Sequence, residues 1–168
     1  MSRSADIHAF LEAAGWGMAQ RAPLAGDAGN RKYERLSHPQ KDPAILMDAD
    51  PANGEDIRPF LNIAAHLKSC GLSSPEVYDA NRDLGLILLE DFGDQLLFDV
   101  AIASPELEYP LYKMCLEALE RLHQTPPPPN VGSYFPQDMA RAIEITLPWY
   151  CSPELAAAIT AELINQLN

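Results

Sequence analysis

The chain has 168 residues, 47% of them apolar, which is enough for one domain or one and a half with a hydrophobic core. It carries 12 basic and 24 acidic residues, a net charge of -12, which argues against a general nucleic-acid or anionic-membrane surface. Cys70, Cys115 and Cys151 are odd in number and form no Cys-x-x-Cys pair, so neither a disulfide framework nor a zinc site is indicated. Residues 1–7 contain no apolar signal-peptide core and no run is long enough to span a bilayer, so we expect a cytoplasmic protein.

A short helix and a β-hairpin are the first elements that the sequence predicts. Ser4 is a candidate N-cap for the helix, and Gly15 ends it. Residues 18–24 have strand character, 26–30 are a turn cluster, and 31–37 resume a two-residue alternation. This pattern predicts a hairpin with a glycine-containing tip. The apolar residues at helical spacing in the first helix are Ile7, Phe10, Leu11 and Ala14.

A third strand and a second helix follow. Residues 38–43 form a polar turn before the short apolar strand 44–47. From 56 to 69 apolar residues repeat with a helical period, Pro59 is tolerated in the first turn, and Gly71 ends the run. We expect this amphipathic helix to cover the sheet.

Two further strands complete the predicted sheet. Residues 75–80 form the fourth strand, and turn chemistry at 81–85 connects it to the fifth, 86–90. The fifth strand begins with a continuous apolar run that is too short for a typical helix, so we expect it to be buried. The sequence therefore predicts five antiparallel strands and one covering helix.

The pattern becomes helical after residue 94. One helix is predicted over 107–122, and four prolines at 126–129 follow it as a stiff connector, with a ligand for a proline-binding module as the alternative. Two more helices are predicted, from about 137 to 147 and, capped by Ser152 with Pro153 at its first position, to Leu167. The apolar stripe of the 107–122 helix comprises Leu107, Leu111, Met114, Cys115, Ala118, Leu119 and Leu122.

Asp91-Phe92-Gly93 also matches the magnesium-binding tripeptide of protein kinases. In a kinase that tripeptide follows a catalytic loop with a His-x-Asp motif, whose aspartate orients the acceptor hydroxyl. None of the four histidines, His8, His38, His66 and His123, opens such a motif. A three-residue match without its partner is weak evidence, so we interpret this tripeptide as a coincidence rather than a metal site.

Four stretches taken together carry a family resemblance: Gly26 to Tyr33, Ala44 to Asp48, Asp56 to Phe60, and Leu86 to Asp94. They resemble aminoglycoside phosphotransferase-type kinases and, within that family, the bacterial branch that phosphorylates N-acetylmuramate and N-acetylglucosamine at the anomeric hydroxyl during cell-wall recycling. The resemblance covers about the N-terminal half of such an enzyme. It implies an α+β fold with a protein-kinase-like nucleotide-binding lobe over 1–91 and the first helices of a helical substrate lobe over 92–168.

The resemblance also implies where ATP would bind. The hairpin tip would lie over the phosphates, because small residues let backbone N–H groups approach anionic oxygens, and the two cations after it would add positive charge. Main-chain groups after the fifth strand would bind the adenine edge, between apolar walls that include Leu24. The alternative is an ordinary hairpin turn and a purely structural strand. The implied cofactor-binding residues are Gly26, Asp27, Ala28, Gly29, Asn30, Arg31, Lys32, Ile45, Leu89, Glu90, Asp91 and Phe92.

Two departures from the kinase pattern bear on activity. Met47 stands where the phosphate-binding lysine of the third strand is usual, so Arg31 or Lys32 would have to replace that lysine, with Glu55 or Asp56 as partner. The catalytic aspartate and the metal-binding asparagine and aspartate of the family belong to segments that would follow Asn168. We therefore assign no catalytic or metal-ligating residue here, expect the Mg²⁺ ligands in those later segments, and expect residues 1–168 alone, as a truncated chain, not to turn over.

The sequence thus predicts an ATP-dependent phosphotransferase that acts on a hydroxyl of a small molecule, an amino sugar or aminoglycoside-like compound. One alternative is a non-catalytic binding module whose exposed apolar surface serves a partner or self-association. A second alternative is an unrelated α+β regulatory domain, which a strand order unlike that of a kinase lobe would favour.

Overall fold

The computed structural model describes residues 2–25, 29–129 and 151–167, together with 131, 132, 134, 135, 137–139 and 142. The chain divides into two compact units, Met1–Pro128 and Pro129–Asn168. The first contains a sheet with helices, and the second contains helix α7 (Pro153–Leu167). The predicted domain boundary between residues 91 and 92 falls inside the first unit, between the sheet and the helices that follow it. It stays a prediction.

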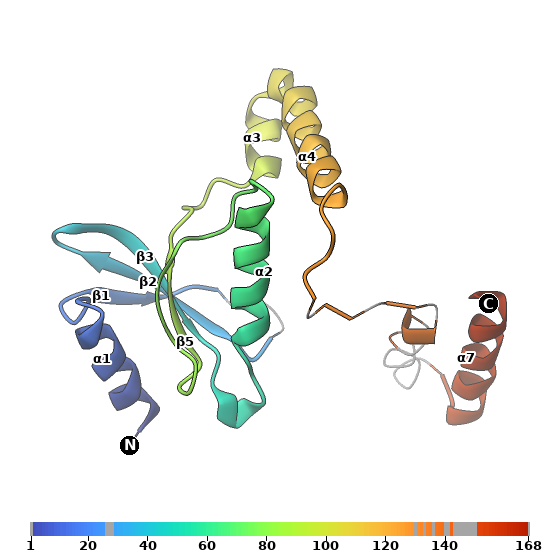
Figure 1. Ribbon diagram of the computed structural model, residues 1–168, viewed down its shortest axis with the longest axis horizontal. Coiled ribbons are helices and arrows are strands. Elements are labelled where there is room, and N and C mark those ends of the chain that lie inside the picture. Colours follow the sequence, from blue (N-terminus) through green and yellow to red (C-terminus); the bar gives the residue numbers. More distant parts are fainter. Residues whose placement is uncertain are drawn as a thin grey trace. The chain divides into compact units, whose positions relative to one another are not determined.

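The first unit is built on one five-stranded sheet in the order β1-β2-β3-β5-β4, in which every neighbouring pair is antiparallel (Figure 1). Both predicted connections are present: β1 pairs with β2 as a hairpin, and β4 pairs with β5 across the turn at 81–85. The predicted five-stranded antiparallel sheet is confirmed. The strands are β1 (Gln20–Pro23), β2 (Lys32–His38), β3 (Lys41–Asp48), β4 (Val77–Asn81) and β5 (Leu86–Glu90).

Strand β3 begins earlier than the sequence predicts. The polar turn expected at 38–43 is only Pro39 and Gln40, and the strand already starts at Lys41. Pro43 made this segment resemble a loop, because proline cannot donate a hydrogen bond to a ladder. The β2/β3 register shifts between Leu36 and His38, so an irregularity in the ladder lies beside the proline.

Helix α1 (Arg3–Ala13) buries the three residues Ile7, Phe10 and Leu11, as its spacing predicts. The expectation that Ser4 caps it is wrong. The N-cap is Ser2, whose extended backbone precedes the helix and whose carbonyl accepts the N–H of Ala5 at 2.9 Å. The Ser2 side chain makes no capping hydrogen bond, so the start of the helix does not depend on serine capping.

Helix α2 (Arg58–Ser69) contains Pro59 in its first turn, as predicted, and Gly71 beyond its end has a φ of 70°. The helix begins two residues later than the predicted start at 56. Asp56 lies in front of the helix and its carboxylate accepts the backbone N–H of Arg58 at 2.9 Å. The residue is thus at the helix start without belonging to the helix.

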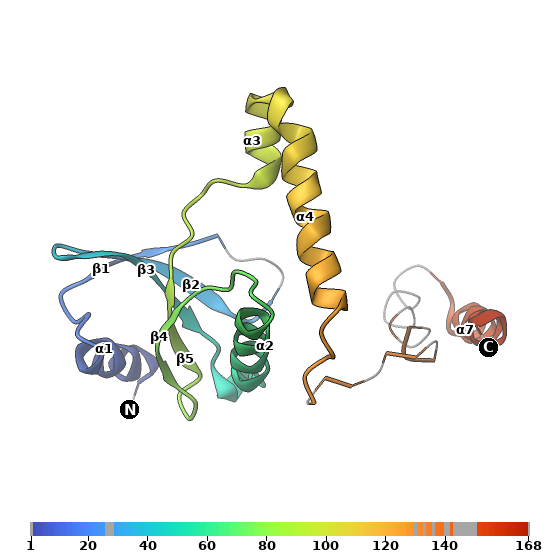
Figure 2. The same ribbon diagram turned by 45° about the horizontal axis from the view of Figure 1, so that its top comes forward.

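The core lies on both faces of the sheet. Leu86 and Leu88 of β5 pack on the side of α1, whereas Ile87 and Leu89 pack on the side of α2, so we call these sides the α1 face and the α2 face. Figure 2 shows the two helices on opposite sides of the strands. Burial on both faces explains why the β5 sequence is continuously apolar rather than alternating.

The chain after β5 is helical, as predicted. It forms α3 (Leu97–Ala103), a short 3-10 helix η2 (Pro105–Leu107) and α4 (Glu108–His123). The guanidinium of Arg121 donates to the carbonyl of Gly71 at 3.1 Å and so ties α4 to the end of α2. Within the described part of the chain the apolar stripe of α4 is largely exposed, Met114 and Leu119 included.

The last predicted helices fall in the second unit. The helix expected over 137–147 lies mostly outside the described residues. Helix α7 starts at Pro153, and the hydroxyl of Ser152 accepts the N–H of Leu155 at 3.4 Å, so the predicted cap is confirmed. None of the described helices has the length and apolar character required to cross a membrane.

Gly85 supports a testable prediction about the turn before β5. Its φ is 63°, its carbonyl accepts the N–H of Ala49 at 2.9 Å, and a Cβ here would lie 2.0 Å from the Ala49 carbonyl oxygen. Gly54 has a φ of 79° but open space around its Cα. Gly54→Ala should cost only the left-handed strain, about 1–2 kcal/mol, whereas Gly85→Ala should cost roughly 1–3 kcal/mol more because the backbone of Ala49 must move. Urea unfolding followed by circular dichroism measures both, and equal losses would contradict the packing argument.

Candidate functional site

Ile45 on β3 and Leu89 on β5 lie side by side on the α2 face of the sheet, and we call this pair the apolar row. Arg35 on β2 is the cross-strand neighbour of Ile45 on β3, and Ile45 is the neighbour of Leu89 on β5. Direct cross-strand neighbours share a face, so the three side chains rise on the same side. Ile45 and Leu89, two of the predicted adenine walls, are therefore adjacent. Leu24 extends the β1/β2 ladder by one bond, from its N–H to the carbonyl of Tyr33 at 2.9 Å.

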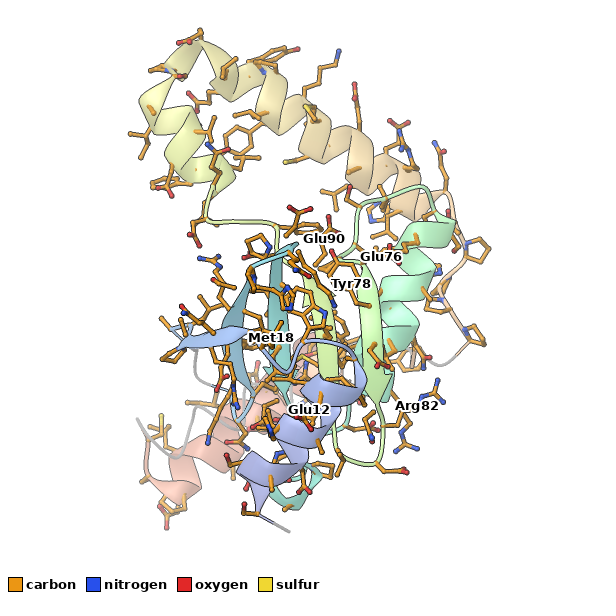
Figure 3. All side chains as sticks on the ribbon, turned by 90° about the vertical axis from the view of Figure 1, so that its left-hand side faces the viewer. Glu12, Met18, Glu76, Tyr78, Arg82 and Glu90 are labelled. Carbon is orange, nitrogen blue, oxygen red and sulfur yellow. The ribbon has the colours of Figure 1, made fainter. Side chains whose placement is uncertain are left out.

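The segment from Glu90 to Asp94, which we call the linker, begins with the last residue of β5 and leaves the sheet after it. The N–H of Glu90 donates to the carbonyl of Glu76 at 2.9 Å, and the Glu90 carboxylate accepts the N–H of Glu76 at 3.0 Å. Figure 3 looks at the sheet from the α1 side and shows these two glutamates next to each other. Asp91 follows the last residue of β5, and its side chain is bound by Arg35, which shares the α2 face with the apolar row.

Arg35 binds the linker through two carboxylates. Its Nε donates to Asp91 Oδ2 at 2.6 Å and its Nη2 to Asp94 Oδ1 at 2.7 Å, and two further bonds complete a double fork. The side chain of Asp91 is only 8% exposed, whereas that of Asp94 is 80% exposed. Asp91 Oδ1 also accepts the N–H of Gly93 at 2.8 Å, which closes a turn around Phe92. The carboxylate of the kinase-like tripeptide is thus engaged by an arginine and a backbone amide.

Sequence reasoning missed Arg35. Its partners lie 56 and 59 positions further along the chain, and β3 separates β2 from β5 in the sheet. A single arginine in an alternating strand gives no signal of such a contact. Across the described residues, no three His, Cys, Asp or Glu side chains are grouped so that they could hold a metal ion.

The second charged contact is an ion pair between Arg31, which precedes β2, and Glu55, which precedes α2. Arg31 Nε lies 2.8 Å from Glu55 Oε2, and this hydrogen bond raises the pKa of Arg31. Of the two partners considered from the sequence, the structure pairs Arg31 with Glu55, whereas Asp56 binds Arg58 through its side chain at 2.9 Å. An open groove of about 320 Å³ lies between Arg31 and α2, bordered by apolar side chains that include Phe60.

The hairpin tip is described in part. Gly29 and Asn30 lie in an exposed bend, and Lys32 is exposed at the start of β2. Gly26, Asp27 and Ala28, which the sequence also assigns to the phosphates, lie outside the described residues. Phe92 of the linker is 60% exposed, so its ring does not contribute to the core.

Met47 lies in the middle of the α2-face core. It is 0% exposed and packs in one cluster with Ile57, Ile87 and Leu89. A charged ammonium group at this position would be buried among apolar side chains without the solvation it needs. The sequence difference from the kinase pattern therefore agrees with the packing around this strand.

Comparison with known proteins identifies the family. The sequence matches the phosphotransferase enzyme family over residues 20–167. The chain belongs to this family. The family assignment confirms the predicted resemblance and agrees with the kinase-like arrangement of a five-stranded sheet followed by helices.

Curated relatives of this chain carry the name N-acetylmuramate/N-acetylglucosamine kinase. The protein from Caulobacter vibrioides is 34% identical over 152 residues, 75% of this chain and 41% of the relative. The protein from Pseudomonas aeruginosa is 28% identical over 155 residues, 90% of this chain and 45% of the relative. The Pseudomonas putida protein is 28% identical over 148 residues, 86% of this chain and 42% of the relative. The chain thus spans less than half the length of these relatives.

The Met47 environment gives a prediction about the stability of this chain. Met47→Lys should destabilise the fold by roughly 3–5 kcal/mol, because it leaves an uncompensated charge in the core. Met47→Leu conserves volume and apolar character and should cost less than about 1.5 kcal/mol. Equilibrium urea unfolding of the two variants measures the difference. A lysine variant as stable as the leucine variant would show that this site can accommodate the usual kinase lysine.

The Arg35 cluster gives a pH prediction. Hydrogen bonds from Arg35 lower the pKa of Asp94 below its usual 3.8, so the pair's contribution to stability is present above that pH and is lost as pH falls through the lowered pKa. In an Arg35→Gln variant the Asp94 pKa should rise towards 3.8. Carboxylate-detected NMR titration measures it. Asp56 is the control, because Arg58 lowers its pKa and the substitution should leave it unchanged. An Asp94 pKa that does not move would contradict the assigned cause.

Proposed function

We propose that this chain supplies the nucleotide-binding part of an ATP-dependent phosphotransferase that acts on a hydroxyl of an amino sugar. Family membership supports phosphoryl transfer, and the names of the relatives supply the substrate class. One observation supports the site most directly. An apolar pair, Ile45 and Leu89, shares the α2 face with Arg35 and lies next to the linker, which is exposed from Phe92 onward.

In this proposal the adenine ring packs against Ile45 and Leu89, with Leu24 at the end of the β1/β2 ladder. Apolar walls with a few polar groups at one edge are the usual composition of a small-molecule site. The polar edge is the main chain of Glu90, Asp91 and Phe92, because peptide groups offer both donors and acceptors for a purine.

The phosphates are assigned to the hairpin tip. Gly29 and Asn30 bring exposed backbone to this place, and Arg31 and Lys32 add local positive charge to a chain whose net charge is -12. Glu55 fixes the direction of the Arg31 guanidinium through the 2.8 Å contact, and arginine is a cation at any physiological pH. Arg31 thereby takes the role that a lysine at the Met47 position would have.

The residues present fit a nucleotide better than they fit a metal. The proposed ligands of a divalent cation are the nucleotide's own phosphate oxygens. ATP supplies the phosphoryl group, and a divalent cation, proposed to be Mg²⁺, neutralises its charge. The residues described here bind and orient the nucleotide.

A non-catalytic binding module is the second candidate. Helices α3 and α4 expose several large apolar side chains, among them Phe98, Ile102, Met114 and Leu116. Clusters of such side chains are typical of protein-binding surfaces, including those of self-association. This candidate requires no nucleotide site, so nucleotide binding separates the two.

Calorimetric titration with ADP and Mg²⁺ tests the proposed function. The wild-type chain should bind saturably, and an Arg31→Gln, Lys32→Gln double variant should bind roughly 10- to 100-fold more weakly, because it loses charged hydrogen bonds to the phosphates. The matched control is Arg21→Gln, which removes an ion pair with Glu34 on the same hairpin. Its affinity should equal that of the wild type. No binding at millimolar ADP would contradict the proposal and favour the binding module.

A further inference from the structure

We propose that Arg35 is a positioning residue that holds the linker in the conformation needed to bind the base. This inference rests on the proposed nucleotide-binding function and adds to it a residue on β2 that the sequence analysis did not assign. Its basis is the double fork that Arg35 makes with Asp91 and Asp94.

The geometry of the contact is specific. One guanidinium makes four hydrogen bonds of 2.6 to 3.2 Å to two carboxylates, one of which is nearly buried. It connects β2 to a segment that continues β5, although β3 lies between these strands. Only the planar fork of arginine can satisfy two carboxylates in this way, since a lysine offers a single point charge.

The contact acts on the peptide groups that the proposed function assigns to the base. Asp91 stands between Glu90 and Phe92, so fixing its side chain limits the rotation of the peptide groups on either side. The same carboxylate accepts the N–H of Gly93 at 2.8 Å, which holds the next turn of the linker. Because Arg35 is also the cross-strand neighbour of Ile45, it sets the position of the linker relative to the apolar row.

A purely structural role predicts a different outcome from a positioning role. Arg35 and Asp94 are solvent-accessible, and exposed ion pairs contribute little to stability. Under a purely structural role, loss of Arg35 should lower the thermal midpoint, because it leaves the 8% exposed Asp91 carboxylate without its cation, and it should leave the affinity of the folded variant unchanged. Under a positioning role, a linker without this anchor must be ordered by the ligand when it binds, so the affinity for the base should fall.

Amide-resolved NMR titrations with ADP and with adenosine test the inference on the whole chain. Arg35→Gln should bind both ligands about tenfold more weakly than the wild type, and Arg35→Lys should not restore the affinity. Arg31→Gln should lose affinity for ADP but keep that for adenosine, which has no phosphate. Arg21→Gln, from the other arginine–carboxylate pair of the hairpin, is the matched control and should bind both ligands as the wild type does.

The outcomes separate the two proposals. A wild-type chain that binds neither ligand overturns the proposed function. A wild-type chain that binds both, with a folded Arg35→Gln variant of unchanged affinity, overturns the role of Arg35 alone. Loss of ADP affinity without loss of adenosine affinity in that variant also overturns it, because Arg35 would then act on the phosphates. A wild-type chain that binds ADP but not adenosine also overturns the role of Arg35.

A second variant covers the case in which Arg35→Gln does not fold. Asp94→Asn changes an exposed side chain and leaves the contact between Arg35 and Asp91 intact. Because Asp94 accepts two of the four hydrogen bonds that orient the Arg35 guanidinium, its loss should weaken adenosine binding about threefold while the amide spectrum stays that of the folded chain. Wild-type affinity for adenosine in this variant overturns the inference.

Discussion

Burial of β5 on both faces is the constraint on which the rest of the structure depends. Its residues Leu86 to Leu89 are at most 4% exposed, and they alternate between the α1 and α2 faces. A slip of the register by one residue would put Gly85 in the buried place of Leu86 or Glu90 in that of Leu89, because the apolar run is only these four residues long. The register in turn fixes where Leu89 lies and where the linker leaves the sheet. The candidate site is therefore positioned by the core.

Two arginines of the α2 face, Arg31 and Arg35, form ion pairs at different places next to the apolar row. Arg35 joins the row to the linker, and Arg31 joins the hairpin tip to the segment before α2. Both arginines are paired with carboxylates, which suits a chain with a net charge of -12, because unpaired acidic groups here would repel an anionic ligand. The pairs give each guanidinium a fixed direction, and the buried Met47 leaves the middle of this face apolar.

The parts of the fold that local pattern determines were predictable. The continuous apolar run of β5 and the helical period of α2 gave the right elements, because burial acts on each side chain where it stands. The start of α1 was not predictable from capping chemistry, since the Ser2 side chain at the N-cap makes no capping hydrogen bond. Pro43 concealed the beginning of β3, which an irregular ladder accommodates.

The candidate site was also predictable only in part. Arg31 and Glu55 were among the few pairings that the family resemblance suggested, and the structure brings them together. The contacts of Arg35 were out of reach, because they join residues 56 and 59 positions apart across an intervening strand. Such a contact depends on the assembled sheet, and no local pattern in β2 or in the linker encodes it.

Hydrogen exchange with and without ADP and Mg²⁺, read by mass spectrometry, tests the central claim that the α2 face and the linker together bind the nucleotide. Saturating nucleotide should slow exchange in residues 29–33 and 90–94 and leave α1 and the segment after it unchanged. Slowed exchange confined to the α1 face, or no change at saturating nucleotide, would contradict the account.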